Sequence, residues 1–366
     1  MSSDSDVSPD NLNDEADRLF GVLKGNEVTW RDRQLFLQSR GYMLRPRLRP
    51  GWKPSWISPR KEVTDCEDSV PLPPRTHLVD ATRMSDGKLV YIKRVKKGDN
   101  ESGIATYLYQ ESLRQDPRNH SVPILDLFED TDDPTVSYMV MPFLSLMDDP
   151  PFETVAEVVD FCDQILEVRY IPGKYSHSSS DCARRNLMMD ASLLYPQGRH
   201  PIYEKLSPDI VTVAPCLSRT AVGGVKYYFI DYGISSYFPP DVPRLVVGKD
   251  GRDKEVPELS HTVPYDPFKV DIFIIGNIFR HQLYDHFSNL SFLEPMIELM
   301  VRPVPEARPT AAQAWEAWRT VRRNITLAHR SWRLHPRTEP LAVTAVLDTV
   351  SLVKTGYSAT RWALGW

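Results

Sequence analysis

The stretch "DCARRNLMMD", residues 181–190, holds the carboxylate of Asp181 and, five residues later, the carboxamide of Asn186. The apolar residues that follow Asn186 predict a short strand. Further along, "VKYYFIDYG", residues 225–233, carries Asp231 at the end of a second apolar strand. Mg²⁺ prefers a few hard oxygen ligands together with phosphate oxygens, and these side chains supply such ligands. The two stretches therefore predict a site for a metal ion and a phosphate group.

A small antiparallel sheet is predicted upstream of this site. The segments "HLVDATRM" (77–84) and "KLVYIKRV" (88–95) have the composition of strands, and "SDG" between them is typical of a hairpin turn. Two further strands are predicted within 121–130 and 135–144. Between the pairs, "ESGIATYLYQESL" (101–113) has apolar residues at helical spacing. The order strand, strand, helix, strand, strand predicts a sheet that carries one helix.

Downstream of residue 146 the chain is predicted to be mainly helical. Apolar residues recur at helical spacing in four segments, which are 154–167, 265–287, 291–301 and 310–325. Together with the upstream sheet, these helices predict an α+β fold class.

The order of short motifs resembles that of the protein kinase domain over residues 72–322. The motifs are Lys93, Asp181-x₄-Asn186, "DYG" (231–233), "VPE" (256–258), Asp271-x₄-Gly276 and "RP" (308–309). Each is short, but six in this order are specific. The segments "RGYMLRPRLRPGW" (40–52), "DATRMSDGKLVYIKR" (80–94) and "MPFL" (141–144) are similar to kinase-like proteins abundant in basidiomycete fungi. The resemblance implies a two-lobed fold, with a small N-terminal antiparallel sheet with one helix and a larger, mainly helical C-terminal lobe.

The resemblance implies ATP and Mg²⁺ as cofactors and gives roles to individual residues. Lys93 would contact the α- and β-phosphates of ATP and pair with a helix glutamate, either Glu101, which we favour, or Glu111. From the residues alone, Lys93 also fits a second interpretation, in which it points outward into solvent from a half-buried strand. Met141 and Phe143 would contact the nucleotide.

The remaining roles belong to the catalytic loop and its support. Asp181 would orient the acceptor hydroxyl and take its proton, and Asn186 and Asp231 would hold Mg²⁺. Three further roles are structural: Glu258 and Arg308 would form a buried ion pair, and Asp271 would hold the catalytic-loop backbone.

The resemblance divides the chain into four parts. Residues 1–71 are a polar N-terminus and a basic, aromatic arm, and 72–145 are the N-terminal lobe. Residues 146–325 are the C-terminal lobe, with an insertion at about 191–226. Residues 326–366 form a tail, for which we expect one amphipathic helix that docks on the domain or on a membrane surface.

Two features depart from the kinase pattern. No glycine-rich loop precedes Lys93, and "KEVTDCEDSVPLPP" (61–74) contains no glycine, although glycines let backbone amides approach phosphates closely. Ser179 and Ser180 stand where kinases carry His-Arg before the catalytic aspartate, and Pro172, Gly173 and a serine run interrupt the helix expected there. Evolved loss or a gene-model error across residues 168–180 would each produce this break.

Three functions follow from these patterns. The first is ATP- and Mg²⁺-dependent transfer of the γ-phosphoryl group to a protein hydroxyl, at reduced activity. The second is a pseudokinase that binds a signalling partner as a scaffold. The third is a small-molecule phosphotransferase, which the "VPE" and "RP" motifs disfavour because they suit a protein-substrate activation segment.

Composition sets outer limits on these functions. The chain has 366 residues and a net charge of −5, which gives no overall attraction to nucleic acid. Its four cysteines follow no metal or disulfide spacing, so free thiols and an intracellular location, cytoplasmic or nuclear, are expected. No apolar run is long enough to span a membrane.

The N-terminal region allows two interpretations. Residues 1 to about 15 are polar and acidic, and we expect them to be disordered. Residues 28–60 combine Trp30, Trp52 and Trp56 with the basic run "RPRLRPGWKPSW" (45–56). That composition suits an RNA or phosphate-rich partner, or an extended arm that packs its tryptophans on the neighbouring domain. We expect the arm, and no nucleic-acid partner.

Overall fold

The computed structural model describes residues 9–108, 110–167, 176–178, 182–231, 233, 236–238 and 242–351. They fall into two compact units, which are described separately. The first unit comprises the described parts of Met1–Lys97, Pro123–Phe143 and Ser192–Leu217. The second comprises those of Gly98–Val122, Leu144–Ala191 and Ser218–Trp366. Helices and antiparallel strands are both abundant, which is compatible with the predicted α+β class.

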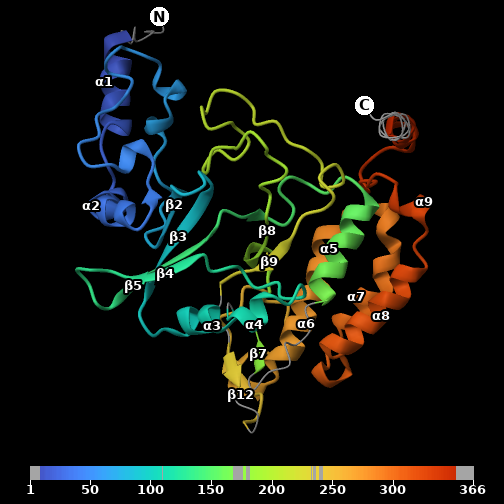
Figure 1. Cartoon of the computed structure of the whole chain (residues 1–366). Helices are drawn as coiled ribbons and strands as arrows, with labels where there is room; N and C mark the ends of the chain where they lie inside the picture. Colours follow the sequence, from blue (N-terminus) through green and yellow to red (C-terminus); the bar gives the residue numbers. More distant parts are fainter. Residues whose placement is uncertain are drawn as a thin grey trace, which may run out of the picture. The chain divides into compact units, whose positions relative to one another are not determined.

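The first unit is built on a five-stranded antiparallel sheet with the strand order β1-β2-β3-β5-β4 (Figure 1). The four longer strands confirm the predicted sheet, and Gly87, at φ 72°, turns the β2–β3 hairpin. The strands are β1 (Tyr42–Met43), β2 (Leu78–Arg83), β3 (Leu89–Lys96), β4 (Asp126–Glu129) and β5 (Val136–Pro142).

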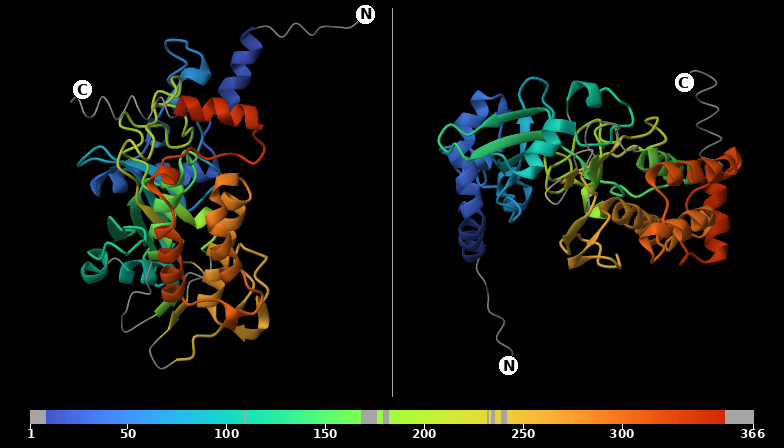
Figure 2. Two further views of the ribbon diagram at one scale, coloured as in Figure 1. Left: turned by 90° about the vertical axis from the view of Figure 1, so that its right-hand side faces the viewer. Right: turned by 90° about the horizontal axis from the view of Figure 1, so that it is seen from below.

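Helix α2 (Gly25–Ser39) covers one face of this sheet (Figure 1, Figure 2). Because side chains alternate along a strand, Val90 and Ile92 of β3 point into the core that α2 closes with Trp30 and Leu37. Lys93 belongs to the alternate set, on the opposite face. The helix that packs on the sheet within its own unit is therefore α2, and the predicted helix after residue 100 belongs to the second unit.

The N-terminal expectations need correction. Residues 28–39 lie in α2 and are therefore not part of an extended arm. The expected packing of a tryptophan is present, since Trp30 is buried in the sheet's core. Helix α1 (Pro9–Phe20) occupies part of the segment that was expected to be disordered. Composition did not indicate α2, because this helix is stabilised by tertiary packing on the sheet, which local propensity does not encode.

The second unit holds the remaining strands. A three-stranded sheet of order β6-β8-β9 joins β6 (Ser145–Leu146), β8 (Leu187–Met189) and β9 (Tyr227–Phe229). Two two-stranded sheets pair β7 (Ser176–Ser178) with β10 (Ser236–Phe238), and β11 (Val246–Gly248) with β12 (Ser260–Tyr265).

The helices of the second unit include those predicted from periodicity. They are α3 (Asn100–Leu108), α4 (Glu111–Arg114), α5 (Val155–Glu167), α6 (Pro267–Ile278), α7 (Glu294–Met300), α8 (Ala311–Arg323) and α9 (Leu327–Arg330). The single helix predicted over 101–113 is two helices, because Gln110 has extended backbone angles (φ −55°, ψ 144°). In the tail, residues 341–351 are helical.

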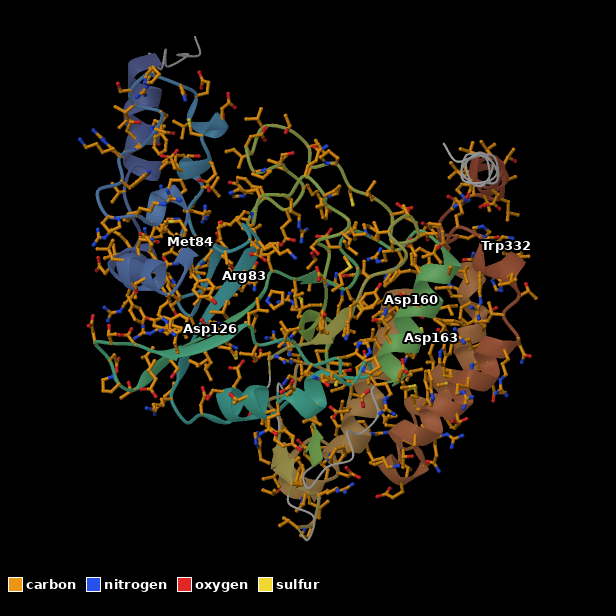
Figure 3. The ribbon with its side chains drawn as sticks, viewed as in Figure 1. Arg83, Met84, Asp126, Asp160, Asp163 and Trp332 are labelled. Carbon is orange, nitrogen blue, oxygen red and sulfur yellow. The ribbon has the colours of Figure 1, made fainter. Side chains whose placement is uncertain are left out.

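Helices α5 and α8 pack through a polar contact as well as apolar ones. Trp318 is fully buried, and its Nε1 donates to Asp163 Oδ1 at 2.7 Å. Figure 3 labels Asp163 on α5, where Asp160 lies one turn earlier. Burial raises the pKa of both carboxyl groups. The carboxyl groups of Asp160 and Asp163 on α5 are therefore partly buried within the unit.

All four cysteines are free, as predicted: Cys66, Cys162 and Cys182 are buried and Cys216 is exposed. Among the described helices, none combines the length and the apolar character that crossing a bilayer requires.

Candidate functional site

The β8–β9 pairing in the second unit brings Asn186 and Asp231 together. Asn186 ends a 3₁₀ turn (Arg184–Asn186) directly before β8 and is 3% exposed. Leu187 pairs with Phe229, and the Ile230 N–H donates to the Asn186 carbonyl at 2.9 Å. Asp231 is the next residue, so the two predicted metal ligands lie at the same end of the β8–β9 strand pair.

The backbone at Asp231 has a left-handed conformation, with φ 63°. This region costs a non-glycine residue about 1–3 kcal/mol and is concentrated at functional sites. A β-carbon at Gly233 would lie 3.4 Å from Asp231 Oδ1, so the missing side chain leaves that approach to the carboxylate open. Arg252 Nη2 lies 3.9 Å from Asp231 Oδ2, with both side chains partly exposed.

Asp181 lies outside the described residues, but the residues that follow it are well anchored. Cys182 Sγ donates to Asp271 Oδ1 of α6 at 3.5 Å, so Asp271 reaches the predicted catalytic loop. Arg184 forms a bidentate ion pair with Asp148: its Nε donates to Oδ2 at 2.7 Å and its Nη2 donates to Oδ1 at 2.8 Å. The loop after Asp181 is thus fixed from both sides.

A second support lies beneath β9. His120 is 3% exposed, and its Nδ1 donates to the Tyr227 carbonyl at 2.8 Å. The Phe229 N–H donates to the His120 carbonyl, and the Val122 N–H donates to the Phe229 carbonyl. Residues 120–122 therefore hold β9, which ends two residues before Asp231, a role that the sequence did not indicate.

We expect His120 to make the protein less stable in mild acid. Burial lowers the pKa of His120, and nearby Lys226 lowers it further. The unfolded chain therefore binds more protons below the usual value of about 6.5, so stability falls as the pH drops from there through the folded pKa. His120→Gln should remove the part of the pH dependence of the unfolding free energy that His120 causes, which is at most about 1.4 kcal/mol per pH unit. Urea unfolding between pH 7 and 5 measures it. The exposed His261→Gln is the control, and equal pH slopes in both variants would contradict the role.

The expected pair between Glu258 and Arg308 is present in the second unit. Arg308 is 2% exposed and donates to both carboxylate oxygens, at 2.6 and 2.8 Å. It also donates to the carbonyls of Arg302 and Lys269, which joins the segment around Glu258 to α6. The pair therefore has the structural role that the sequence predicted.

Lys93, Met141 and Phe143 lie in the first unit. Lys93 is partly buried in β3 and is paired with Met139 of β5 in the sheet register, while Tyr91 is paired with Met141. The rings of Tyr91 and Phe143 lie 4.8 Å apart. The face of the sheet on which ATP contacts were predicted thus carries an aromatic pair.

The insertion contributes to the same part of the first unit. Arg199 is 5% exposed, and its guanidinium lies 5.2 Å from the Phe143 ring centre. An ion pair of 2.8 Å holds Arg199 to Glu204. Burial is the main reason that the pKa of Tyr91 is raised, and the Glu204 carboxylate adds to the effect.

The predicted site residues therefore divide into two groups. Asn186 and Asp231 come together in the second unit, and Lys93, Met141 and Phe143 share the first. Glu101 lies in the first turn of α3, in the second unit, and its pairing with Lys93 stays a prediction. The alternation of β3 was a signal for Tyr91, since residues 91 and 93 must share a face.

The side chains at one end of the β8–β9 strand pair, Asn186 and Asp231, fit a magnesium ion. Asn186 and Asp231 offer amide and carboxylate oxygens, and Mg²⁺ commonly takes one or two protein ligands and completes its shell with phosphates and water. Within the described ranges, no cluster of three or more His, Cys, Asp or Glu side chains is arranged for a metal. The pair alone is therefore suited to an ion that arrives with phosphate.

No protein-family model and no curated protein matches this chain.

Proposed function

We propose that the chain is a protein-kinase-like phosphotransferase that moves the γ-phosphoryl group of ATP to a protein hydroxyl, with a two-lobed kinase-like fold. The observation that carries the proposal is the β8–β9 pairing, which sets Asn186 beside Asp231 in its left-handed conformation. The contact between Cys182 and Asp271 and the pair of Glu258 with Arg308 agree with it.

The residues would divide the work as follows. Asn186 and Asp231 would hold Mg²⁺, which neutralises charge on the phosphates when it is bound. Lys93 would contact the α- and β-phosphates, and Asp181 would accept the proton of the acceptor hydroxyl. Rate enhancement in such a site comes from positioning and electrostatics, which the buried supports of the loop and of β9 favour.

The proposal is tested by ligand-dependent stability. A ligand that binds only the native state raises the unfolding free energy by about 2.7 kcal/mol at a concentration of 100 Kd. ATP should raise the melting temperature more with Mg²⁺ than without it, and Asp231→Ala should remove the Mg²⁺-dependent part. An ATP shift of the same size with and without Mg²⁺ would contradict the proposal.

A second candidate, a pseudokinase that acts as a binding module, is favoured by one observation. Tyr91 and Phe143 pack together where adenine was expected, and Arg199 lies over Phe143. The absence of a glycine-rich loop before Lys93 also favours this candidate. Weak or absent nucleotide binding would leave partner binding as the function.

Replacing Tyr91 separates the two candidates. If the aromatic pair restricts the nucleotide face, Tyr91→Ala should bind Mg²⁺-ATP about tenfold more tightly than the wild type, equivalent to about 1.4 kcal/mol. Tyr91→Phe keeps the ring and serves as the matched control, with unchanged affinity. Calorimetric titration measures all three. Equal affinities in Tyr91→Ala and Tyr91→Phe would mean that the ring does not restrict binding.

A further inference from the structure

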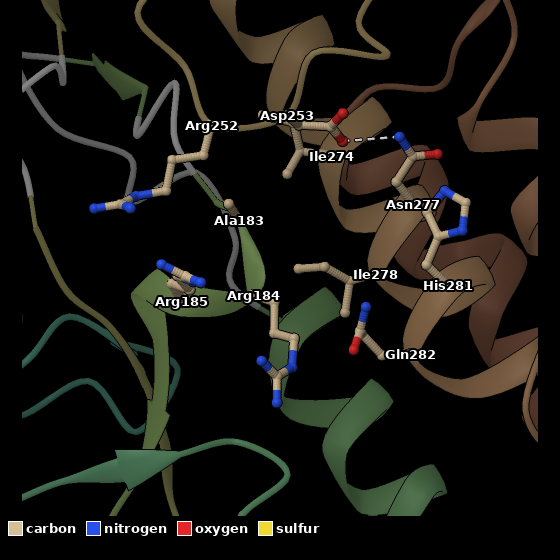
Figure 4. Close-up of a pocket in the computed structure, with 10 residues that line it drawn as sticks. All are labelled: Ala183, Arg184, Arg185, Arg252, Asp253, Ile274, Asn277, Ile278, His281 and Gln282. Atoms are coloured by element: carbon tan, nitrogen blue, oxygen red, sulfur yellow. Dashed lines mark hydrogen bonds between the residues drawn. The ribbon is translucent and has the colours of Figure 1, made fainter.

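An open cavity of about 480 Å³ lies in the second unit beside the predicted catalytic loop (Figure 4). Its wall carries three arginines and a single carboxylate, so its lining is predominantly cationic. The lining residues come from the loop after Asp181, from the segment before "VPE" and from α6 and the π-helical turn that continues it; they are Ala183, Arg184, Arg185, Arg252, Asp253, Ile274, Asn277, Ile278, His281 and Gln282.

The arginines differ in how they are held. Arg184 forms a bidentate ion pair with Asp148. Arg185 is exposed, and within the described part of the chain it makes no hydrogen bond or ion pair. Arg252 is half exposed and lies 3.9 Å from Asp231. Figure 4 shows Arg185 and Arg252 on the same side of the cavity. Arg185 and the neighbouring Arg252 therefore present positive charge to a ligand in the cavity.

The opposite wall comes from α6. Ile274 and Ile278 form its apolar part, and both are almost fully buried. Asn277 is 4% exposed, and its Nδ2 donates to Asp253 at 2.8 Å, which fixes the orientation of the amide. Its Oδ1 is buried without a donor among the described residues. The amide is therefore a fixed part of the wall, and the positive charges that a ligand meets in the cavity are those of the arginines.

We propose that this cavity binds an acidic side chain of a peptide substrate, through Arg185 and Arg252. Arginine recognises carboxylate and phosphate oxygens with strong, charge-assisted hydrogen bonds, so aspartate, glutamate or a phosphorylated residue carries the required chemistry. The claim that the acidic residue accompanies a phosphate acceptor rests on the proposed function. The cavity is lined by residues two to four positions after Asp181, which places the acidic group close to the acceptor.

Peptide binding without nucleotide tests the proposal. Three fluorescent peptides of one sequence around a serine carry flanking glutamate, phosphoserine or glutamine, and anisotropy measures their affinities for the wild type. We expect at least one acidic peptide to bind about tenfold more tightly than the glutamine peptide, and the difference between the two acidic peptides identifies the preferred anion. Added salt should weaken this preference, because exposed charges are screened.

Variants locate the site. Arg185→Ala should weaken the acidic peptide about tenfold and leave the glutamine peptide unchanged. Arg319→Ala is the matched control, since Arg319 is an exposed arginine of α8 that pairs with Glu316 outside the cavity. Equal binding of acidic and glutamine peptides, or equal losses in both variants, would overturn the proposal.

The result of the peptide-binding test can be distinguished from the result of the Mg²⁺-ATP test of the proposed function. Peptide discrimination needs neither ATP nor Mg²⁺, so it can persist when the Mg²⁺-dependent shift is absent. That combination would contradict phosphotransfer and keep the cavity as the binding surface of a pseudokinase. A normal Mg²⁺-ATP shift without peptide discrimination would overturn the cavity proposal alone.

Discussion

Replacing Arg47 by alanine is expected to lower the free energy of unfolding by about 3–5 kcal/mol, because it leaves the Glu27 carboxylate buried without its partner. Both side chains are fully buried, with Arg47 Nε 2.7 Å from Glu27 Oε1. The guanidinium also donates to the Val22 carbonyl at 2.9 Å. The Glu27 oxygens accept backbone N–H groups of Lys24 and Leu72, which hold the carboxylate in place.

Urea unfolding followed by tryptophan fluorescence measures this loss. The exposed Arg319→Ala is the control and should change stability by less than about 0.5 kcal/mol. Although burial raises the pKa of Glu27, the hydrogen bonds from Arg47 and the backbone lower it below its usual value. The stabilisation is therefore present above the unfolded pKa and is lost as the pH falls through the folded one. A loss below about 1 kcal/mol in Arg47→Ala at pH 7 would contradict the assigned role.

The second large effect concerns Asp181. If it is the general base, Asp181→Asn should lower the rate of phosphoryl transfer by about 10²–10⁴, because the amide cannot accept the proton of the acceptor hydroxyl. The substitution is nearly isosteric, so Mg²⁺-ATP binding and unfolding should change little. Transfer of ³²P from ATP to a protein acceptor, at saturating Mg²⁺, measures the rate.

Asp65→Asn is the matched control for this variant, because Asp65 is an exposed aspartate of the first unit. It should retain the wild-type rate. Asp181→Asn with the same transfer rate as Asp65→Asn would show that the measured activity does not use Asp181, and the catalytic assignment would be withdrawn.

The elements with clear periodicity could be predicted from the sequence. The alternation of β2, β3 and β5 and the helical spacing of α5 and α8 are local signals, and the structure has these elements where the sequence places them. The placement of Asn186 and Asp231 at the ends of short strands was predictable for the same reason. The contact between Glu258 and Arg308 followed from the order of motifs.

The role of the basic run could not be predicted from composition. Arg45 and Arg47 belong to "RPRLRP", yet both are buried in ion pairs, Arg45 with Asp80 at 3.0 Å and Arg47 with Glu27. Whether an arginine faces solvent or a buried carboxylate depends on a partner that lies 20 or more residues away, and no local pattern encodes that choice. The absence of a nucleic-acid partner stays a prediction.

The insertion shows a second limit. Part of it, Ser192–Leu217, belongs to the first unit, although the strands on either side of it belong to the second. His200 is fully buried and lies 3.3 Å from Glu67, and Ile202 packs against the core of the sheet. Such long-range packing depends on tertiary context. The sequence located the insertion but gave no indication of what it contacts.

Mg²⁺-dependent stabilisation by ATP reports on the proposed site of Asn186 and Asp231. We expect ATP with Mg²⁺ to raise the melting temperature of the wild type beyond the shift with ATP alone. Asp231→Ala, which removes the carboxylate that follows β9, should abolish the difference. Identical shifts in the wild type with and without Mg²⁺, or an undiminished Mg²⁺-dependent shift in Asp231→Ala, would contradict the assignment of Asn186 and Asp231 as a magnesium–phosphate site.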